Sequence, residues 1–322
     1  MQLSNKDKNI FQNPIIITLL ALLCCALWGS ATPFIKTGYS LLEVEGVPST
    51  ILFAGMRFTL AGVITVAIYS IARRKILYPK AKNMPKVLTV SAFQTVIQYI
   101  LFYIGLANTS GVKGTIASGS SAFFCVLIAS LIFRQEKLTF KKIFACVLGF
   151  AGIVIVNLNG LELSMNLLGD GFVIFSTISS AFSSVLVKRF SSDEDPVVIS
   201  GYQFIAGGIF LVVLGLALGG TIKLADLTGL LVLLYLAILS AVAYAVWGTL
   251  LKHNPVSRVT IFSFTTPIFG TLLSMLMLSA ESSGTQPLNL VITLILVSLG
   301  ILLLNYQPGA KESSGAKSKQ DP

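Results

Sequence analysis

The chain repeats short patterns at an almost constant distance along the sequence. One apolar run closes with Gly-Ile-Val-Ile-Val-Asn at residues 152–157, and another closes with Gly-Ile-Leu-Leu-Leu-Asn at residues 300–305, which is 148 residues later. The pattern Gly-x-x-Phe-x-x-x-Gly at residues 55–62 returns at residues 201–208, an offset of 146. Each pair alone is weak, but the kept order and spacing predict an internal duplication.

Long apolar segments make up most of the chain. It is 54% hydrophobic and 11% charged, with a mean hydropathy of +0.85, so it has too few polar residues to cover a surface in water. We therefore expect an all-α polytopic membrane protein. Ten runs are long enough to cross a bilayer, at about residues 14–35, 50–72, 86–106, 115–133, 142–158, 170–187, 197–219, 228–251, 259–280 and 287–306.

The basic residues indicate how the ten segments are threaded. With the N-terminus inside, 19 of the 23 Lys and Arg fall on the inner side, and Lys36, Lys113 and Lys223 fall on the outer side. Positive charge in membrane proteins gathers on the cytoplasmic side. We therefore expect a multi-pass protein of the cell membrane with both termini cytoplasmic. The net charge of +10 reflects this topology and not a nucleic-acid partner.

Five spans in each half is an odd number, so the second half enters the bilayer from the opposite side. This predicts two inverted five-helix repeats, residues 14–160 and 161–306, between a cytoplasmic N-terminal segment (1–13) and a disordered cytoplasmic tail (307–322). Many secondary transporters are inverted repeats of this kind and bind substrate near midplane between the halves. The glycines of the two Gly-x-x-Phe patterns are expected to let helices approach closely.

A set of motifs follows a fixed order along nearly the whole chain. The motifs are Ala26-Leu-Trp28-Gly29-Ser30 with Lys36 beyond it, Arg57 in span two, apolar runs into Glu136 and Glu281, Thr266-Pro267 in span nine, and the two Gly-apolar-Asn closures. With these motifs in this order, the sequence resembles the drug/metabolite transporter superfamily, in its ten-span EamA-type branch.

The resemblance implies two repeats, alternating access, and export or uptake of small metabolites, often amino acids or related compounds. One position departs from a symmetric pattern, because the first half has Ala122 where the second has Pro267. Proline is a common cause of helix kinks. A symmetric kink in the two halves is therefore in doubt.

Polar side chains at helical spacing in span three predict a face turned toward protein or water. Gln94 and Gln98 lie four residues apart, with Tyr99 and Tyr103 on the flank of this stripe. Buried amides in hydrocarbon are costly unless they are satisfied. The stripe predicts either a wet cavity, which we favour, or interhelical hydrogen bonding.

Four other residues are candidates for the wall of a substrate pathway. Trp28 lies at mid-depth in span one, too deep for an aromatic belt. Tyr244 and Trp247 share one face of span eight, although Trp247 fits an interfacial anchor about as well. Ser180, in the serine-rich span six, fits either close helix packing or a pathway.

Arg57 is the most informative single residue for a functional site, because a cation within the membrane must find a partner or water. Two interpretations stay open, with the first slightly favoured. Arg57 reaches outward or donates to carbonyls at a helix end and so stabilises the bundle, or it contacts a substrate carboxylate. Lys36, nearer the outer surface, is expected to be a solvated charge that biases the entrance toward anions.

No Asp or Glu lies in the middle of any predicted span, and the single histidine, His253, lies at a helix end. Proton-coupled carriers commonly titrate an intramembrane carboxylate or histidine. We therefore expect facilitated transport or exchange, with an amino acid, a carboxylate or a neutral amphipathic metabolite as substrate. We expect no cofactor or metal, and the four cysteines (Cys24, Cys25, Cys125 and Cys146) are expected to be small buried side chains.

The favoured function is a carrier of a small metabolite, as exporter or exchanger, in a lipid bilayer. A multidrug or toxic-compound efflux carrier, a passive channel and a non-transporting assembly protein remain as alternatives. An enzyme is not expected, because intramembrane catalysis needs clustered His, Asp or Glu or a metal set, which the spans do not offer.

Overall fold

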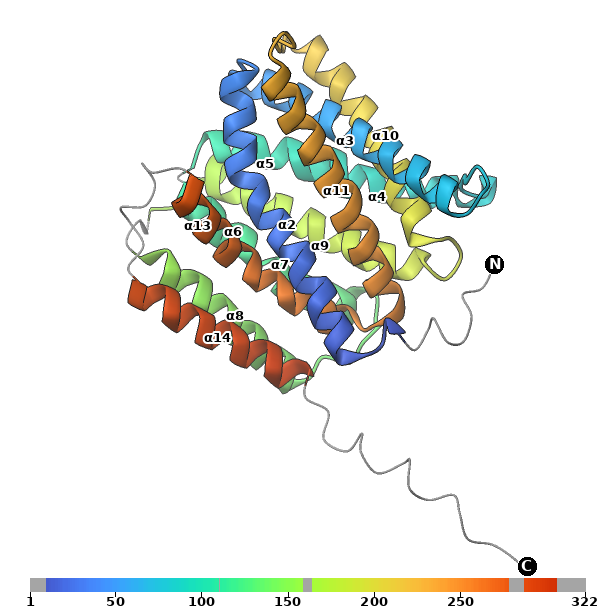
Figure 1. Ribbon diagram of the computed structural model, residues 1–322. Helices are drawn as coiled ribbons and strands as arrows, with labels where there is room; N and C mark the ends of the chain where they lie inside the picture. The colour runs from blue at the N-terminus through green and yellow to red at the C-terminus, as the bar shows by residue number, and fades with distance from the viewer. Residues whose placement is uncertain (1–9, 110, 159–163, 278–286, 306–322) are drawn as a thin grey trace, which may run out of the picture.

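The computed structural model describes residues 10–109, 111–158, 164–277 and 287–305, and these residues form a bundle of helices without a strand (Figure 1). In chain order the helices and helical turns are α2 (Pro14–Leu41), α3 (Gly46–Ala72), η1 (Ala81–Asn83), α4 (Met84–Ser91), η2 (Ala92–Ile97), α5 (Gln98–Ala107), α6 (Gly111–Gly119), α7 (Ser121–Leu127), η3 (Ile128–Ile132), α8 (Phe140–Val156), η5 (Leu167–Gly171), α9 (Phe172–Phe190), α10 (Pro196–Ala217), α11 (Leu227–His253), α12 (Val256–Thr260), η6 (Ile261–Thr265), α13 (Thr266–Met277) and α14 (Pro287–Asn305).

The ten expected spans are confirmed as helical segments. Within the described residues, nine stretches are at least 18 residues long and apolar enough to cross a membrane. The tenth is α8, which has 17 residues. The clearest difference in bounds is in α2, which continues to Leu41, so Lys36 lies within the helix as an exposed side chain and not beyond its end.

The two halves are interrupted at equivalent places, although only one of them has the proline. In the second half, the 3₁₀ turn η6 gives way to α13 at Thr265–Thr266, just before Pro267. In the first half, α6 ends at Gly119 and α7 begins at Ser121. At this break the N–H and the Oγ of Ser120 both donate to Ala117 O, at 3.1 and 2.6 Å. The absence of a proline in the first half therefore does not prevent a helix break there.

The repeated glycine pattern forms the contact between α3 and α10, which lie side by side (Figure 1). A Cβ added at Gly62 would lie 2.5 Å from the Gly201 carbonyl oxygen, and a Cβ at Gly55 would lie 2.9 Å from that of Gly208. Each glycine of one repeat thus packs against the backbone of its counterpart pattern. The expected close approach is confirmed, and it relates the halves by an internal twofold axis.

The second repeated pattern pairs in the same reciprocal way, between α8 and α14. Gly152 packs against Thr293, whose Oγ1 donates to Gly152 O at 2.8 Å, and Gly300 packs against Ala145. The closing asparagines repeat as well: the side-chain amide of Asn157 donates to Ile153 O at 2.8 Å, and that of Asn305 donates to Ile301 O at 3.1 Å.

Ionic contacts join the connections at both ends of the α3–α10 pair. At the end where α3 begins, Lys223 pairs with Glu43 at 2.5 Å, and its backbone N–H donates to Leu42 O at 3.0 Å. At the end where α10 begins, Lys86 pairs with Asp193, and Glu194 accepts from the Asn83 side chain at 3.0 Å. We name these the Glu43 end and the Asp193 end.

The two ends of the bundle's chain lie on one face of the molecule. The Asn254 side chain donates to Phe11 O at 2.8 Å, next to the start of α2. Four residues beyond Asn254, the Arg258 Nε donates to the Asn305 side chain at 3.0 Å, at the end of α14. An even number of crossings returns the chain to the face from which it started, as ten spans require.

Replacing Gly62 tests the glycine contact. Gly62→Ala puts a methyl against the Gly201 and Ile205 backbone, which cannot move aside as a flexible side chain does, so we expect a loss of about 1–3 kcal/mol of stability and a larger loss for Gly62→Leu. Gly270→Ala is the matched control, because its Cβ meets nothing nearer than 3.5 Å. Thermal unfolding of the detergent-purified variants measures the stability of each. Equal unfolding temperatures for G62A and G270A would contradict the close contact between α3 and α10.

Acidification tests the Asp193 end. The Lys86 partner holds the pKa of the Asp193 carboxyl below its usual range. Partial burial raises the pKa of Glu194, but hydrogen bonds from Asn83 and the Lys80 N–H outweigh it and lower that pKa. A carboxyl whose pKa is lower in the folded than in the unfolded state contributes stability above its unfolded-state pKa. That contribution is lost as the pH falls through the folded-state pKa of the carboxyl, below about pH 4. We expect Glu194→Gln to be less stable than wild type at pH 7 and to lose less on acidification; parallel pH profiles would refute this.

Candidate functional site

Aromatic rings from the two halves meet on the internal axis. Phe58 of α3 stacks on Phe204 of α10, with ring centroids 5.0 Å apart and planes 13° from parallel. The hydroxyls of Tyr99 in α5 and Tyr244 in α11 lie 3.4 Å apart. In sequence, each residue of these two pairs is the repeat counterpart of the other, at offsets of 146 and 145. We call the region around these four rings the seam.

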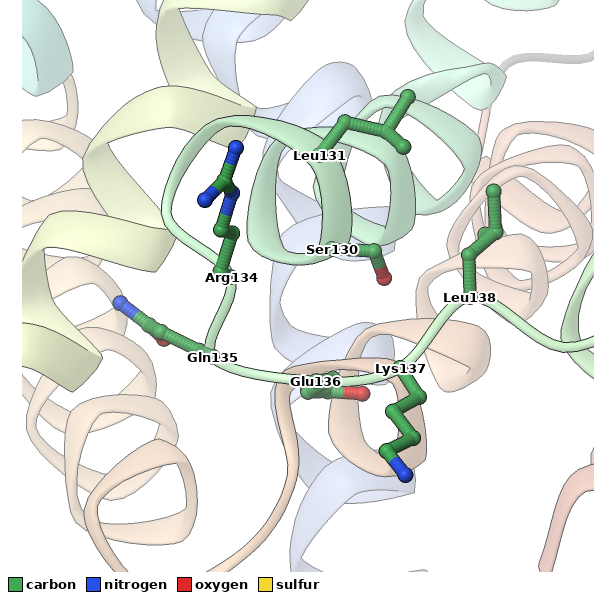
Figure 2. A pocket seen from close by; sticks show the side chains of 7 residues that line it. All are labelled: Ser130, Leu131, Arg134, Gln135, Glu136, Lys137 and Leu138. Carbon is green, nitrogen blue, oxygen red and sulfur yellow. The ribbon is translucent and has the colours of Figure 1, made fainter.

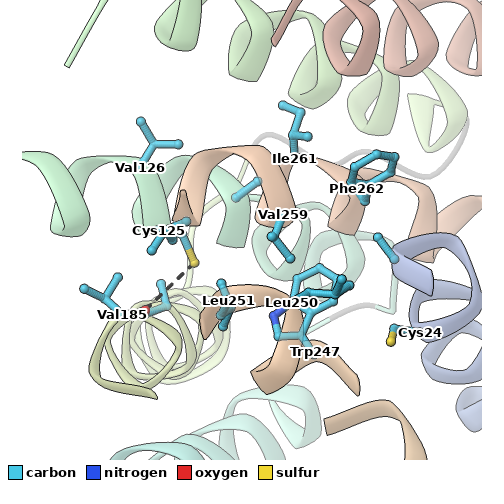
Figure 3. Packing of buried hydrophobic residues seen from close by; sticks show 14 of the residues in the cluster. Cys24, Cys125, Val126, Val185, Trp247, Leu250, Leu251, Val259, Ile261 and Phe262 are labelled. Atoms are coloured by element: carbon cyan, nitrogen blue, oxygen red, sulfur yellow. Dashed lines mark hydrogen bonds between the residues drawn. The ribbon is translucent and has the colours of Figure 1, made fainter. Parts of the chain in front are cut away.

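Trp28 and Trp247 extend the seam toward the face with the chain ends. The Trp28 ring meets Tyr244 and Trp247 edge to face, at centroid distances of 5.2 and 4.9 Å. Trp247 is 6% exposed and packs into the large apolar cluster with Cys24 and Leu251 (Figure 3). A ring so enclosed does not anchor a membrane interface. The Trp28 Nε1–H is also enclosed, and it has no acceptor within the described residues.

A π-helical turn changes the register of span three. Because η2 winds with more residues per turn than an α-helix, the expected line from Gln94 to Gln98 is broken, and Tyr99 falls into line with Gln94 instead. Gln94 is 6% exposed, so its side chain lies inside the bundle. Gln98 is partly buried, and its Oε1 accepts no bond from the described residues. The prediction that Gln94 and Gln98 lie on one face of span three was wrong, because it assumed 3.6 residues per turn throughout.

Arg57 lies inside the bundle and is 3% exposed, so it does not reach outward to water. Its Nε and Nη2 both donate to Ser240 Oγ, at 3.1 and 2.9 Å, and its guanidinium lies 5.1 Å from the centre of the Phe58 ring. The structure thus brings Arg57 to the seam, with a serine as its bonded partner.

Gln203 is a seam residue that the sequence analysis missed. It is fully buried, its Oε1 accepts from Thr95 Oγ1 at 2.7 Å, and its Nε2 has no acceptor within the described residues. The available signal was the repeat itself, because Gln203 stands at the offset of 146 from Arg57.

The remaining candidates lie at different places. Tyr103 is 8% exposed and packs against Tyr99, at a centroid distance of 5.9 Å, so it borders the seam. Ser180 is partly buried, and its backbone oxygen accepts from Ser183. The neighbouring Ser179 is the one that joins span three, donating to Phe93 O at 2.6 Å.

A surface hollow of about 570 Å³ lies away from the seam, on the connection after η3 (Figure 2). Its residues are Ser130, Leu131, Arg134, Gln135, Glu136, Lys137 and Leu138. Glu136 already has partners: it accepts from the Ser257 N–H at 3.0 Å, at the start of α12, and pairs with Lys142 at 2.6 Å. A carboxylate at a helix N-terminus stabilises that helix, so Glu136 holds spans four and nine together.

The fold and seam define a multi-pass helical membrane protein whose two inverted halves meet at aromatic and polar side chains. The sequence pattern of the EamA-like transporter family matches residues 15–158 and again residues 167–306. The chain belongs to this family, and its function is membrane transport of small molecules.

Named relatives are transporters as well. The chain is 27% identical to a probable amino-acid metabolite efflux pump of Escherichia coli (strain K12), over 92% of this chain and 98% of that protein. It is 27% identical to an uncharacterized transporter of Archaeoglobus fulgidus, over 80% of this chain and 88% of that protein. A crystal structure with 17% identity shares the fold, with a TM-score of 0.72 over 90% of this chain and 96% of the other.

The two tryptophans of the chain, Trp28 and Trp247, make intrinsic fluorescence a probe of the seam. We expect a transported compound to change the tryptophan emission of the purified protein, because a ligand at the seam alters the surroundings of both rings. Trp28→Phe should reduce that change and keep the fold. A transported compound that leaves the emission unaltered at saturation would place binding elsewhere.

Proposed function

We propose that this protein is a secondary transporter that carries a small metabolite across the cell membrane by alternating access. The single observation that carries the proposal is the seam, where counterpart residues of two inverted halves touch on the internal axis. In inverted-repeat transporters the substrate binds at such an interface, and rocking of the halves exposes it to each side in turn. The two repeats are residues 14–160 and 161–306.

Side chains of several spans form the substrate site in this proposal. Aromatic rings supply apolar contact, and a few placed polar groups orient the ligand, as in most small-molecule sites. The residues are Trp28, Arg57, Gln94, Gln98, Tyr99, Tyr103, Ser180, Tyr244 and Trp247, to which we add Gln203. The packing of rings in the seam favours a carrier, which opens to one side at a time, over an open pore.

The substrate is an amino acid, a carboxylate or a neutral amphipathic metabolite, and the direction is export or exchange. The name of the Escherichia coli relative, a probable amino-acid metabolite efflux pump, supports amino acids and export. The excess of Lys and Arg on one side supports a cytoplasmic location for both termini. A multidrug efflux carrier is the alternative, because stacked rings also accept varied apolar compounds.

Counterflow in proteoliposomes tests the proposal. Vesicles loaded with an unlabelled amino acid should take up the labelled compound transiently and saturably, which a pore does not do. Because no acidic residue lies in the middle of a span, a pH gradient alone should drive little accumulation. Strong accumulation driven by the pH gradient would refute facilitated transport, and non-saturable flux of all compounds would refute a carrier.

A further inference from the structure

The internal duplication supplies a control for Arg57 within the same chain. Arg57 precedes the phenylalanine of the pattern in α3, and Gln203 precedes it in α10. Both are buried, at 3% and 0% exposure. Both are bonded to a hydroxyl of the opposite half, Arg57 to Ser240 and Gln203 to Thr95. Positions 57 and 203 are therefore equivalent in burial and in hydrogen bonding across the halves, but Arg57 is charged and Gln203 is neutral.

The two bonds lie on opposite sides of the tyrosine pair. Ser240 comes four residues before Tyr244, on the side of the Glu43 end, where α11 begins. Thr95 comes four residues before Tyr99, on the side of the Asp193 end, where the third span begins. Four residues of helix, about 6 Å along the helix axis, separate each of these hydroxyl residues from the tyrosine of its own span. We call the two bonds the Arg57 latch and the Gln203 latch.

Helix packing does not explain why one latch is charged. At the Gln203 latch an uncharged amide, bonded to a hydroxyl, joins spans seven and three. An amide at position 57 would join spans two and eight in the same way, without the larger cost of placing a cation in a low-dielectric interior. Stability alone would thus favour glutamine at both positions, so the charge of Arg57 points to a ligand.

The surroundings of Arg57 leave that charge available. Within the described part of the chain, Arg57 donates its hydrogen bonds to the Ser240 hydroxyl, and no salt bridge joins it to a carboxylate there. Two enclosed polar atoms at the same seam, Trp28 Nε1 and Gln203 Nε2, find no hydrogen-bond partner among the residues that the structure describes. Buried polar groups are normally satisfied, and an unsatisfied group in a site calls for an explanation such as a ligand.

We propose that Arg57 receives the carboxylate of the transported metabolite, which replaces Ser240 as the acceptor when spans two and eight separate. The planar guanidinium matches a carboxylate with two parallel hydrogen bonds, whereas a serine hydroxyl offers one oxygen. The Trp28, Tyr99 and Tyr244 rings contact the apolar part of the same molecule. The Gln203 latch is the uncharged counterpart: when its hydrogen bond to Thr95 breaks, no charged group is left without a partner. This inference rests on the proposed function and names its substrate class.

Paired ligands test the inference by separating charge from shape. The ligands are the proteinogenic amino acids and 3-phenylpropionate, each beside its primary amide, and binding is read as a rise in the unfolding temperature of the purified full chain. The wild type should bind at least one carboxylate about tenfold or more tightly than its amide, as a charge-assisted bidentate pair implies. Arg57→Gln should remove this preference.

A second variant tests the role of Arg57 even if Arg57→Gln fails to fold. Ser240→Ala removes the internal acceptor, so it should tighten carboxylate binding and leave amide binding unchanged, which a merely structural Arg57 does not predict. Arg258→Gln is the matched control, because it removes a partly buried arginine at the other end of the bundle, bonded to Asn305. It should keep the wild-type preference.

Each other outcome overturns the inference. An unchanged preference in Arg57→Gln, or no tightening in Ser240→Ala, would make Arg57 structural. A wild type that binds no carboxylate of the panel would also overturn it, while counterflow of a neutral compound would leave the proposed transporter intact. Failure of counterflow with every compound would remove the proposed function itself.

Discussion

The close packing of α3 on α10 is the contact on which the rest of this structure depends. Four glycines let the two backbones touch, and this brings Phe58 onto Phe204 and sets the internal axis. In lipid, helices gain little from burying apolar surface against one another, so close van der Waals contact through small residues is a main source of association. The seam follows from this contact, because the neighbouring spans pack around the same pair.

The central pairs of the seam are symmetric, so the position at which the two halves differ within them is informative. The phenylalanines, the tyrosines and the hydroxyl partners all recur in both halves, yet one half carries an arginine and the other a glutamine. Two inverted halves that exchange conformations need equivalent packing, and this the repeated residues provide. A substrate has no such symmetry. A residue that recognises one end of the substrate, such as its carboxylate, is therefore expected where the halves differ.

Much of the fold could be predicted from the sequence, because apolar length, basic loops and repeat spacing are all set by the bilayer and by duplication. The details that failed are local. The helix break at Ser120 occurs without a proline, and the π-helical turn before Gln98 shifts the side-chain spacing that a regular α-helix would have. Arg57 was conspicuous for its charge, whereas Gln203 was not, although the offset from Arg57 marks it. Which polar atoms lack partners is decided by side chains from distant spans.

A structure of the protein with its transported substrate bound tests the central claim most directly. The account predicts that the ligand lies between the two halves, against Tyr99 and Tyr244, with an acceptor group on Arg57 in place of Ser240. It also predicts that spans two and eight are further apart than here. A ligand seated in the hollow around Glu136, or between α8 and α14, with the seam packed as in this structure, would contradict it.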